Sequence, residues 1–106
     1  MLRKSPPPLS RSAQRVMEYL DVVKSAQALR GYAKRYDFLK KAMNEAYTDY
    51  IIGYLKDNGL ISEGNEGEYR LTKEGEYCLD TLKKHRNLAA IFTTELSGDR
   101  IRRWDS

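Results

Sequence analysis

The side chains that most often perform catalysis or bind metal are scarce in this sequence. It contains one cysteine, Cys78, and one histidine, His85, which lies in the basic run from Lys83 to Arg86. A single cysteine excludes an intramolecular disulfide and a cysteine-based zinc site. A catalytic triad or a metal site needs several such groups to converge, so we expect no enzymatic activity, no metal and no cofactor.

The chemistry that the sequence does favour is the binding of a polyanion. Residues 1–43 hold ten Lys and Arg against three acids, residues 44–80 three against nine, and residues 81–106 six against three. These segments therefore carry +7, −6 and +3, which sum to the net charge of +4. A basic front and tail around an acidic middle indicate a polyanion that meets part of the surface. The alternative is a Lys/Glu-rich surface that serves solubility and ion pairing.

The elements that must position these charges are mainly helical. Apolar residues recur at helical spacing over residues 12–29, 34–43 and 44–57, and in the second of these helices we expect Met43 to face inward. Glycines within residues 63–67 predict a turn between short strands at 60–61 and 68–71. Thr72 is expected to cap a fourth helix that reaches past residue 90, in which Gly75 allows a close approach to another backbone.

The chain of 106 residues suits one domain with a modest core. Residues 1–11 contain three consecutive prolines and predict an extended basic arm, residues 12–96 the domain, and residues 97–106 a basic tail. No apolar run approaches the roughly 18 residues that span a bilayer. We therefore expect a cytoplasmic protein that associates with the nucleoid.

Three stretches carry a resemblance to a known family. They are Gly31-Tyr32-Ala33-Lys34-Arg35, Tyr54-Leu55-Lys56-Asp57-Asn58-Gly59-Leu60-Ile61 and Tyr69-Arg70-Leu71-Thr72-Lys73-Glu74-Gly75. With the predicted order of elements, residues 13–90 resemble a winged helix-turn-helix domain, which is mainly α with a small β-hairpin as its wing. The sequence is similar to small archaeal winged-helix DNA-binding proteins and regulators that dimerise through a C-terminal helix. It resembles the multiple-antibiotic-resistance and PadR-type repressors more distantly.

The resemblance implies a DNA-binding surface. In such proteins the second helix of the helix-turn-helix enters the major groove, a role that falls here to residues 44–57. The side chains then expected to read bases are Tyr47, Asp49, Tyr50 and Lys56. Those expected at phosphates are Lys34, Arg35, Lys40 and Lys41, with Arg70 as the cation of the wing. The acids of the third helix and of the wing depart from this pattern, because acids that face phosphates weaken binding.

The fourth helix carries more apolar residues than the core of a small domain needs. An exposed apolar seam is usually covered by a partner, and two-fold homodimers are the commonest solution. We expect the dimer interface to be formed by Leu79, Leu82, Ala89, Phe92 and Leu96. The alternative is a helix that folds back across its own domain.

The function expected from these observations is a homodimeric transcriptional regulator that binds double-stranded DNA. One alternative is a winged helix that binds a basic protein through its acidic third helix and wing. Another is an architectural protein that coats DNA without sequence preference through its basic front.

Overall fold

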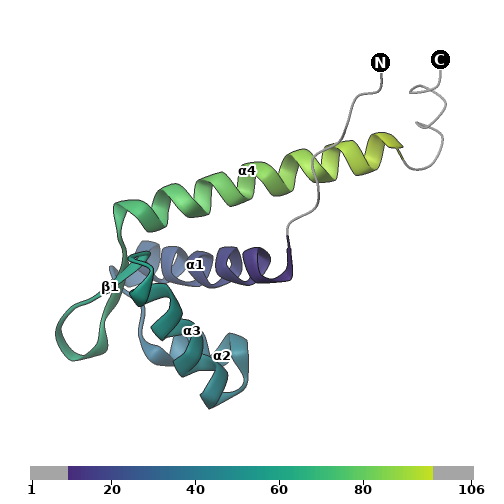
Figure 1. Ribbon diagram of the computed structural model, residues 1–106. Helices are drawn as coiled ribbons and strands as arrows, with labels where there is room; N and C mark the ends of the chain where they lie inside the picture. The colour runs from purple at the N-terminus through teal and green to yellow at the C-terminus, as the bar shows by residue number, and fades with distance from the viewer. Residues whose placement is uncertain (1–9, 97–106) are drawn as a thin grey trace.

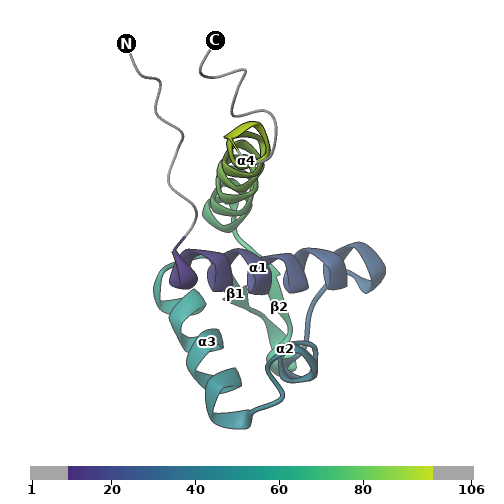
Figure 2. The same ribbon diagram turned by 90° about the vertical axis from the view of Figure 1, so that its right-hand side faces the viewer.

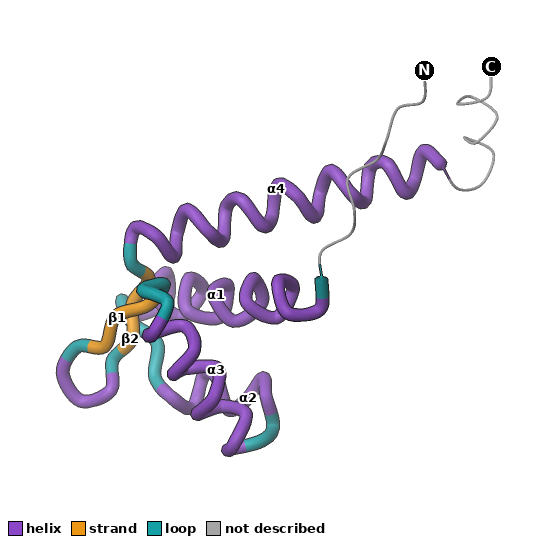
Figure 3. Tube along the Cα trace, viewed as in Figure 1, coloured by secondary structure: helices purple, strands orange, loops and turns teal. Residues whose placement is uncertain are grey.

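The computed structural model describes the backbone of residues 10–96 and the side chains of residues 10–87. Over this range, four α-helices and a two-stranded antiparallel hairpin follow one another in the expected order (Figures 1 and 3). The expected fold class, mainly α with a small β-hairpin, is confirmed. The elements are α1 (Arg11–Arg30), α2 (Arg35–Ala42), α3 (Glu45–Asp57), β1 (Ile61–Glu63), the 3₁₀ turn η1 (Asn65–Gly67), β2 (Tyr69–Leu71) and α4 (Lys73–Leu96).

Three of these helices begin at a side chain that satisfies a free backbone amide. Ser10, Asn44 and Thr72 each accept a hydrogen bond from the amide three residues later, at 3.1, 2.7 and 3.0 Å. Such caps stabilise a helix by about 1 kcal/mol. The end of α1 is also determined by a single nearby residue. Gly31 takes the left-handed backbone conformation, with φ of 94°, and closes the helix.

Met43 lies outside α2, contrary to expectation. α2 ends at Ala42, and Met43 has a φ of 57° and a side chain that is 83% exposed. The prediction that Met43 faces inward is therefore wrong. The physical reason is the short connection to α3. The left-handed backbone at Met43 closes α2 through a hydrogen bond to the carbonyl of Leu39 and leaves Asn44 extended, as an N-cap must be.

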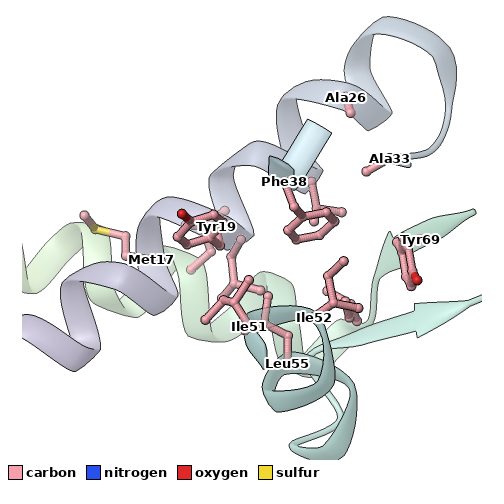
Figure 4. Close-up of a cluster of buried hydrophobic side chains, with 13 residues drawn as sticks. Met17, Tyr19, Ala26, Ala33, Phe38, Ile51, Ile52, Leu55 and Tyr69 are labelled. Carbon is pink, nitrogen blue, oxygen red and sulfur yellow. The ribbon is translucent and has the colours of Figure 1, made fainter. Parts of the chain in front are cut away.

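The core lies where α1, α2, α3 and the hairpin meet (Figure 4). The ring of Phe38 lies between those of Tyr19 and Tyr69, stacked on the first at 6.3 Å between centroids and edge-on to the second at 5.7 Å. Aromatic pairs of this kind stabilise a core by about 0.5–1.5 kcal/mol beyond burial alone. The apolar faces predicted for the first and third helices are confirmed by the buried residues Tyr19, Leu20, Val23, Thr48, Ile51, Ile52 and Leu55.

The hairpin of residues 61–71, called the wing from here on, is attached to the helices through its backbone. Ile61 pairs with Leu71 at its base. Ala33, in the connection between α1 and α2, exchanges two backbone hydrogen bonds of 2.8 Å with Tyr69. The side-chain oxygen of Gln27 on α1 accepts a third from the amide of Leu71, at 2.6 Å. The base of the wing is therefore held by two separate segments of the helical part.

The first turn of α4 packs directly on Leu60, the residue before the wing. A Cβ added at Gly75 would lie 2.0 Å from the carbonyl oxygen of Leu60. No other residue type fits this position without movement of one backbone or the other. The prediction that Gly75 permits a close approach between two backbones is confirmed.

α4 then crosses α1 and projects away from the rest of the domain (Figures 1 and 2). Leu79 is fully buried, Leu82 packs against the core, and Lys83 Nζ lies 2.9 Å from Asp21 Oδ1 on α1. Leu79 is therefore a residue of the domain core and is not accessible to a second copy of the chain. The backbone continues as a helix to Leu96, but the side chains of the other expected interface residues lie outside the described part, namely Ala89, Phe92 and Leu96.

Candidate nucleic-acid interface

The outer face of α3 is the surface that the sequence predicts to contact bases. Its inner face is fixed in the core, and Thr48 also donates a hydrogen bond of 2.7 Å to the carbonyl of Asn44. Ala46 and Asp49 are exposed on the outside, and Gly53 follows them one turn later. A Cβ added at Gly53 would meet no atom within 4 Å. The outer face of α3 therefore has open space around Gly53, where another molecule can approach the helix backbone.

Three tyrosines form a row along α3, which we call the tyrosine ladder: Tyr47, Tyr50 and Tyr54. Neighbouring ring centroids are 5.8 and 6.3 Å apart. Tyr47 is half-buried and touches Tyr19 of α1, whereas Tyr50 is 61% exposed and Tyr54 41% exposed. The outer two rings are therefore available to a ligand.

Two residues predicted to contact DNA are paired with each other. Arg35 at the start of α2 donates to both carboxylate oxygens of Asp49, at 2.9 and 3.2 Å, and lies 3.6 Å from Glu45. Hydrogen bonding from Arg35 lowers the pKa of Asp49 below its usual range, and the same bond raises the pKa of the guanidinium. The pair is exposed and bidentate, so it fixes the orientation of both side chains at the edge of α3.

The remaining predicted cations differ in how they are held. Lys56 reaches the wing, where its Nζ lies 2.6 Å from a carboxylate oxygen of Glu63, and this hydrogen bond raises the pKa of Lys56. Lys41 lies 3.7 Å from Glu18 on α1. Lys40 is exposed and forms no ion pair with any residue that the structure describes. Of these three, Lys40 is the most readily available to an anion.

A basic cluster that the sequence did not predict lies at the base of the wing. The cationic groups of Arg30, Lys34 and Arg70 lie 5.6, 5.7 and 5.9 Å from the centroid of the Tyr32 ring. We call these four residues the Tyr32 cluster. The three cations come from the end of α1, the connection to α2, and β2. They converge because the bridge between Ala33 and β2 brings these segments together.

The cations of the Tyr32 cluster are only partly neutralised. Arg30 pairs with the carboxylate of Asp37, and this hydrogen bond raises the pKa of the guanidinium. Arg70 lies 3.5 Å from Glu68, while Lys34 donates to a backbone carbonyl of the wing at 2.9 Å. Three positive groups thus share two carboxylates, and the cluster keeps a net positive charge.

The Tyr32 cluster and the outer face of α3 belong to one continuous surface. Arg35, which pairs with Asp49 of α3, directly follows Lys34 of the cluster. α2, α3 and the wing lie on one side of α1, and α4 lies on the other (Figure 2). The surface that could meet a ligand through α3 is therefore on the opposite side of the domain from α4.

Other chemistries find little support in the described part of the chain. It contains no group of three or more His, Cys, Asp or Glu side chains that could hold a metal ion. Burial raises the pKa of the half-buried Cys78 thiol, which disfavours the reactive thiolate. No helix in this part of the chain has the length and apolar character needed to cross a membrane.

Comparison with known proteins agrees with this architecture. A family model described as winged helix-turn-helix matches residues 16–90, a range that includes α2, α3 and the whole wing. No curated protein and no solved structure matches the chain.

Proposed function

Since the chain belongs to the winged helix-turn-helix family, we propose that it is a homodimeric transcriptional regulator that binds double-stranded DNA. In this proposal α3 lies in the major groove, where Tyr50 and the surface around Gly53 meet base edges. The Tyr32 cluster and Lys40 contact phosphates beside it.

The continuous surface from α3 to the Tyr32 cluster is the observation that carries the proposal. Base contacts alone give little affinity, because most of the binding free energy comes from cations that displace counterions at phosphates. The Tyr32 cluster supplies such cations next to α3, whose outer face is exposed and has open space around Gly53. It joins Lys34 and Arg70, two cations far apart in the sequence, into one phosphate-binding surface.

The acids near this surface are compatible with DNA binding because most of them are paired. Asp49, Glu63 and Glu68 each pair with a cation, so they add little net negative potential. Exposed ion pairs contribute about 0–1 kcal/mol. A phosphate can therefore replace Glu68 as the partner of Arg70 at low cost, because the pair is 3.5 Å long and the side chain of Arg70 is exposed.

The helix propensity of Gly53 is a second line of support for contact with bases. Glycine in a helix interior costs about 1 kcal/mol relative to alanine. Packing within the described chain does not explain this cost, because a Cβ at Gly53 would meet no atom within 4 Å. Close approach of the major-groove edge to the helix backbone would explain it.

The homodimer in this proposal forms through the part of α4 that projects from the domain. Leu82, Ala89, Phe92 and Leu96 are the proposed contacts, and Leu79 belongs to the core. Analytical ultracentrifugation of the intact protein should give twice the chain mass, and Phe92→Glu should give the monomer. A monomer at tens of micromolar wild-type protein would contradict this part of the proposal.

Fluorescence anisotropy with a labelled duplex tests DNA binding. Selection from a random pool first supplies the preferred duplex. The double variant K34Q/R70Q should bind any duplex at least tenfold more weakly and lower the salt dependence by about two phosphate contacts. Lys24→Gln removes an exposed cation from α1, away from this surface, and should have little effect. Tyr50→Ala should change the preferred sequence more than the general affinity. Absence of binding to any duplex at low salt would refute the proposal.

A protein-binding role is the second candidate, and it is favoured by the acids that remain at the surface. The side chain of Glu45 is 78% exposed at the start of α3, and Asp57 is exposed at its end. This candidate predicts a basic protein partner and no duplex binding. Loss of partner binding in Glu45→Gln, together with no effect of K34Q/R70Q, would favour it.

A further inference from the structure

A groove between the start of α1 and α3 is lined by residues that, apart from Tyr50, the proposed duplex interface does not use. Its volume is about 340 Å³, and its walls include Arg11 and Arg15 of α1 and the tyrosine ladder of α3. Arg15 is separated from Arg30 of the Tyr32 cluster by fifteen residues of one helix, or about 22 Å. The groove is therefore a separate feature from the phosphate-binding surface proposed above.

The positive charge of this groove is not paired with a carboxylate among its lining residues. No acidic residue lines it, and neither Arg11 nor Arg15 forms an ion pair with a residue that the structure describes. The guanidinium of Arg15 instead lies 5.4 Å from the centroid of the Tyr47 ring. Many other cations of the domain, such as Arg35 and Lys56, are paired with carboxylates. The groove therefore favours an anionic ligand.

The aromatic wall of the groove favours a ligand with flat rings. The two outer tyrosines are 61% and 41% exposed, and the three rings follow one another at 5.8 and 6.3 Å. Aromatic rings left open in a row can stack on flat partners without enclosing them. A row of stacking rings beside a positively charged wall is the arrangement that proteins use to bind unpaired nucleotides.

We propose that this groove binds an unpaired segment of a nucleic-acid strand, with bases stacked on the tyrosine ladder and phosphates held by Arg11 and Arg15. A base in a duplex cannot stack in this way, because both of its faces are covered by neighbouring base pairs. The protein would then hold two forms of nucleic acid at different surfaces, with Tyr50 at the boundary between them. A free nucleotide presents the same base and phosphate, so the test must distinguish the two sources.

The test measures anisotropy of a labelled twelve-residue oligothymidylate with the full chain at low salt. The matched probe has the same backbone with abasic sites in place of the bases. The oligothymidylate should bind, and the abasic strand should bind at least fivefold more weakly, because stacking on an aromatic side chain changes affinity by about 5- to 150-fold per base. The preferred duplex is measured in parallel for every variant.

The variants separate charge from stacking. R11Q/R15Q should weaken single-strand binding at least tenfold and leave duplex binding within twofold, while Lys24→Gln should change neither. Tyr54→Leu, which keeps bulk but removes the ring, should weaken single-strand binding about fivefold or more. Tyr54→Phe, which keeps the ring, should retain it. Thermal unfolding confirms that each variant is folded.

Four results would overturn the proposal. The first is that the oligothymidylate does not bind, and the second is that the abasic strand binds as tightly as the oligothymidylate. The third is that Lys24→Gln weakens single-strand binding as much as R11Q/R15Q does. The fourth is that R11Q/R15Q weakens duplex binding as much as single-strand binding. The last result would make the groove part of the duplex interface. Displacement of the strand by micromolar thymidine monophosphate would show that the groove binds base and phosphate, and would identify a free nucleotide as its ligand. If the protein binds no duplex, the measurements with the oligothymidylate and the abasic strand are unaffected, so the two proposals fail separately.

Discussion

Replacing Gly75 by alanine should destabilise the protein, whereas the same substitution at Gly53 should stabilise it. Both glycines lie within helices, and neither has a positive φ. They differ in what a new methyl group would meet. At Gly53 it would meet nothing within 4 Å, and at Gly75 it would lie 2.0 Å from the carbonyl oxygen of Leu60.

The magnitudes follow from these contacts. A helical glycine replaced by alanine gains about 0.5–1 kcal/mol of stability, so Gly53→Ala should raise the free energy of unfolding by that amount. At Gly75 an ordinary contact of 3.4 Å would require a displacement of 3.4 − 2.0 = 1.4 Å. Overpacking costs about 1–3 kcal/mol. The carbonyl that would move also accepts the hydrogen bond of the Thr72 amide, at 3.1 Å, which contributes about 1 kcal/mol. Gly75→Ala should therefore lose about 1–3 kcal/mol net.

Urea unfolding followed by circular dichroism measures both changes against the wild type. Gly75→Ala should also lower the melting temperature by about 4–8 °C for each kcal/mol lost. The two variants are matched in chemistry, so a difference between them reports the local contact alone. Equal or greater stability of Gly75→Ala would refute the close packing of α4 on the backbone of Leu60.

Three further outcomes are expected. Thr72→Ala should lower the free energy of unfolding by about 1 kcal/mol in the same urea assay, because α4 loses its N-cap. Gln27→Met should cost about 1–3 kcal/mol, because the part-buried amide of Leu71 loses its acceptor, and hydrogen exchange of that amide should accelerate. In Arg35→Gln the pKa of Asp49, followed by carboxyl NMR, should rise towards its ordinary value. Because the folded-state pKa is depressed, the stability contributed by this pair is present above the unfolded-state pKa and is lost as pH falls through the folded-state value.

The elements of the fold could be predicted from the sequence because their signals are local. The caps at Asn44 and Thr72 and the end of α1 at Gly31 depend on side chains within a few residues of each boundary. Helical spacing of apolar residues located the buried faces of α1 and α3 for the same reason. The apolar side chain of Met43 predicts an inward position. The short turn after α2 instead requires a left-handed backbone at Met43, which places its side chain outside the core.

The candidate site was predicted less completely because it depends on contacts between distant segments. Lys34 and Arg70 were identified singly, but nothing near either residue indicates that they meet Arg30 around one tyrosine ring. The pairing of Arg35 with Asp49 is not evident from the sequence for a similar reason, since the two residues are 14 positions apart and on different helices. The opposite charges of Arg35 at the start of α2 and of Asp49 near the start of α3 are the signal that the sequence offers for this pairing.

The bridge between Ala33 and Tyr69 also determines how the domain can open. Because the base of the wing exchanges backbone hydrogen bonds with the connection between α1 and α2, the wing cannot detach without exposing the buried ring of Tyr69. Opening of the wing is therefore coupled to loss of the core around Phe38, which packs edge-on against that ring. The wing and the helical core form one cooperative unit, and the slowest amide exchange should extend from α1 into β2 rather than stop at the end of the helices.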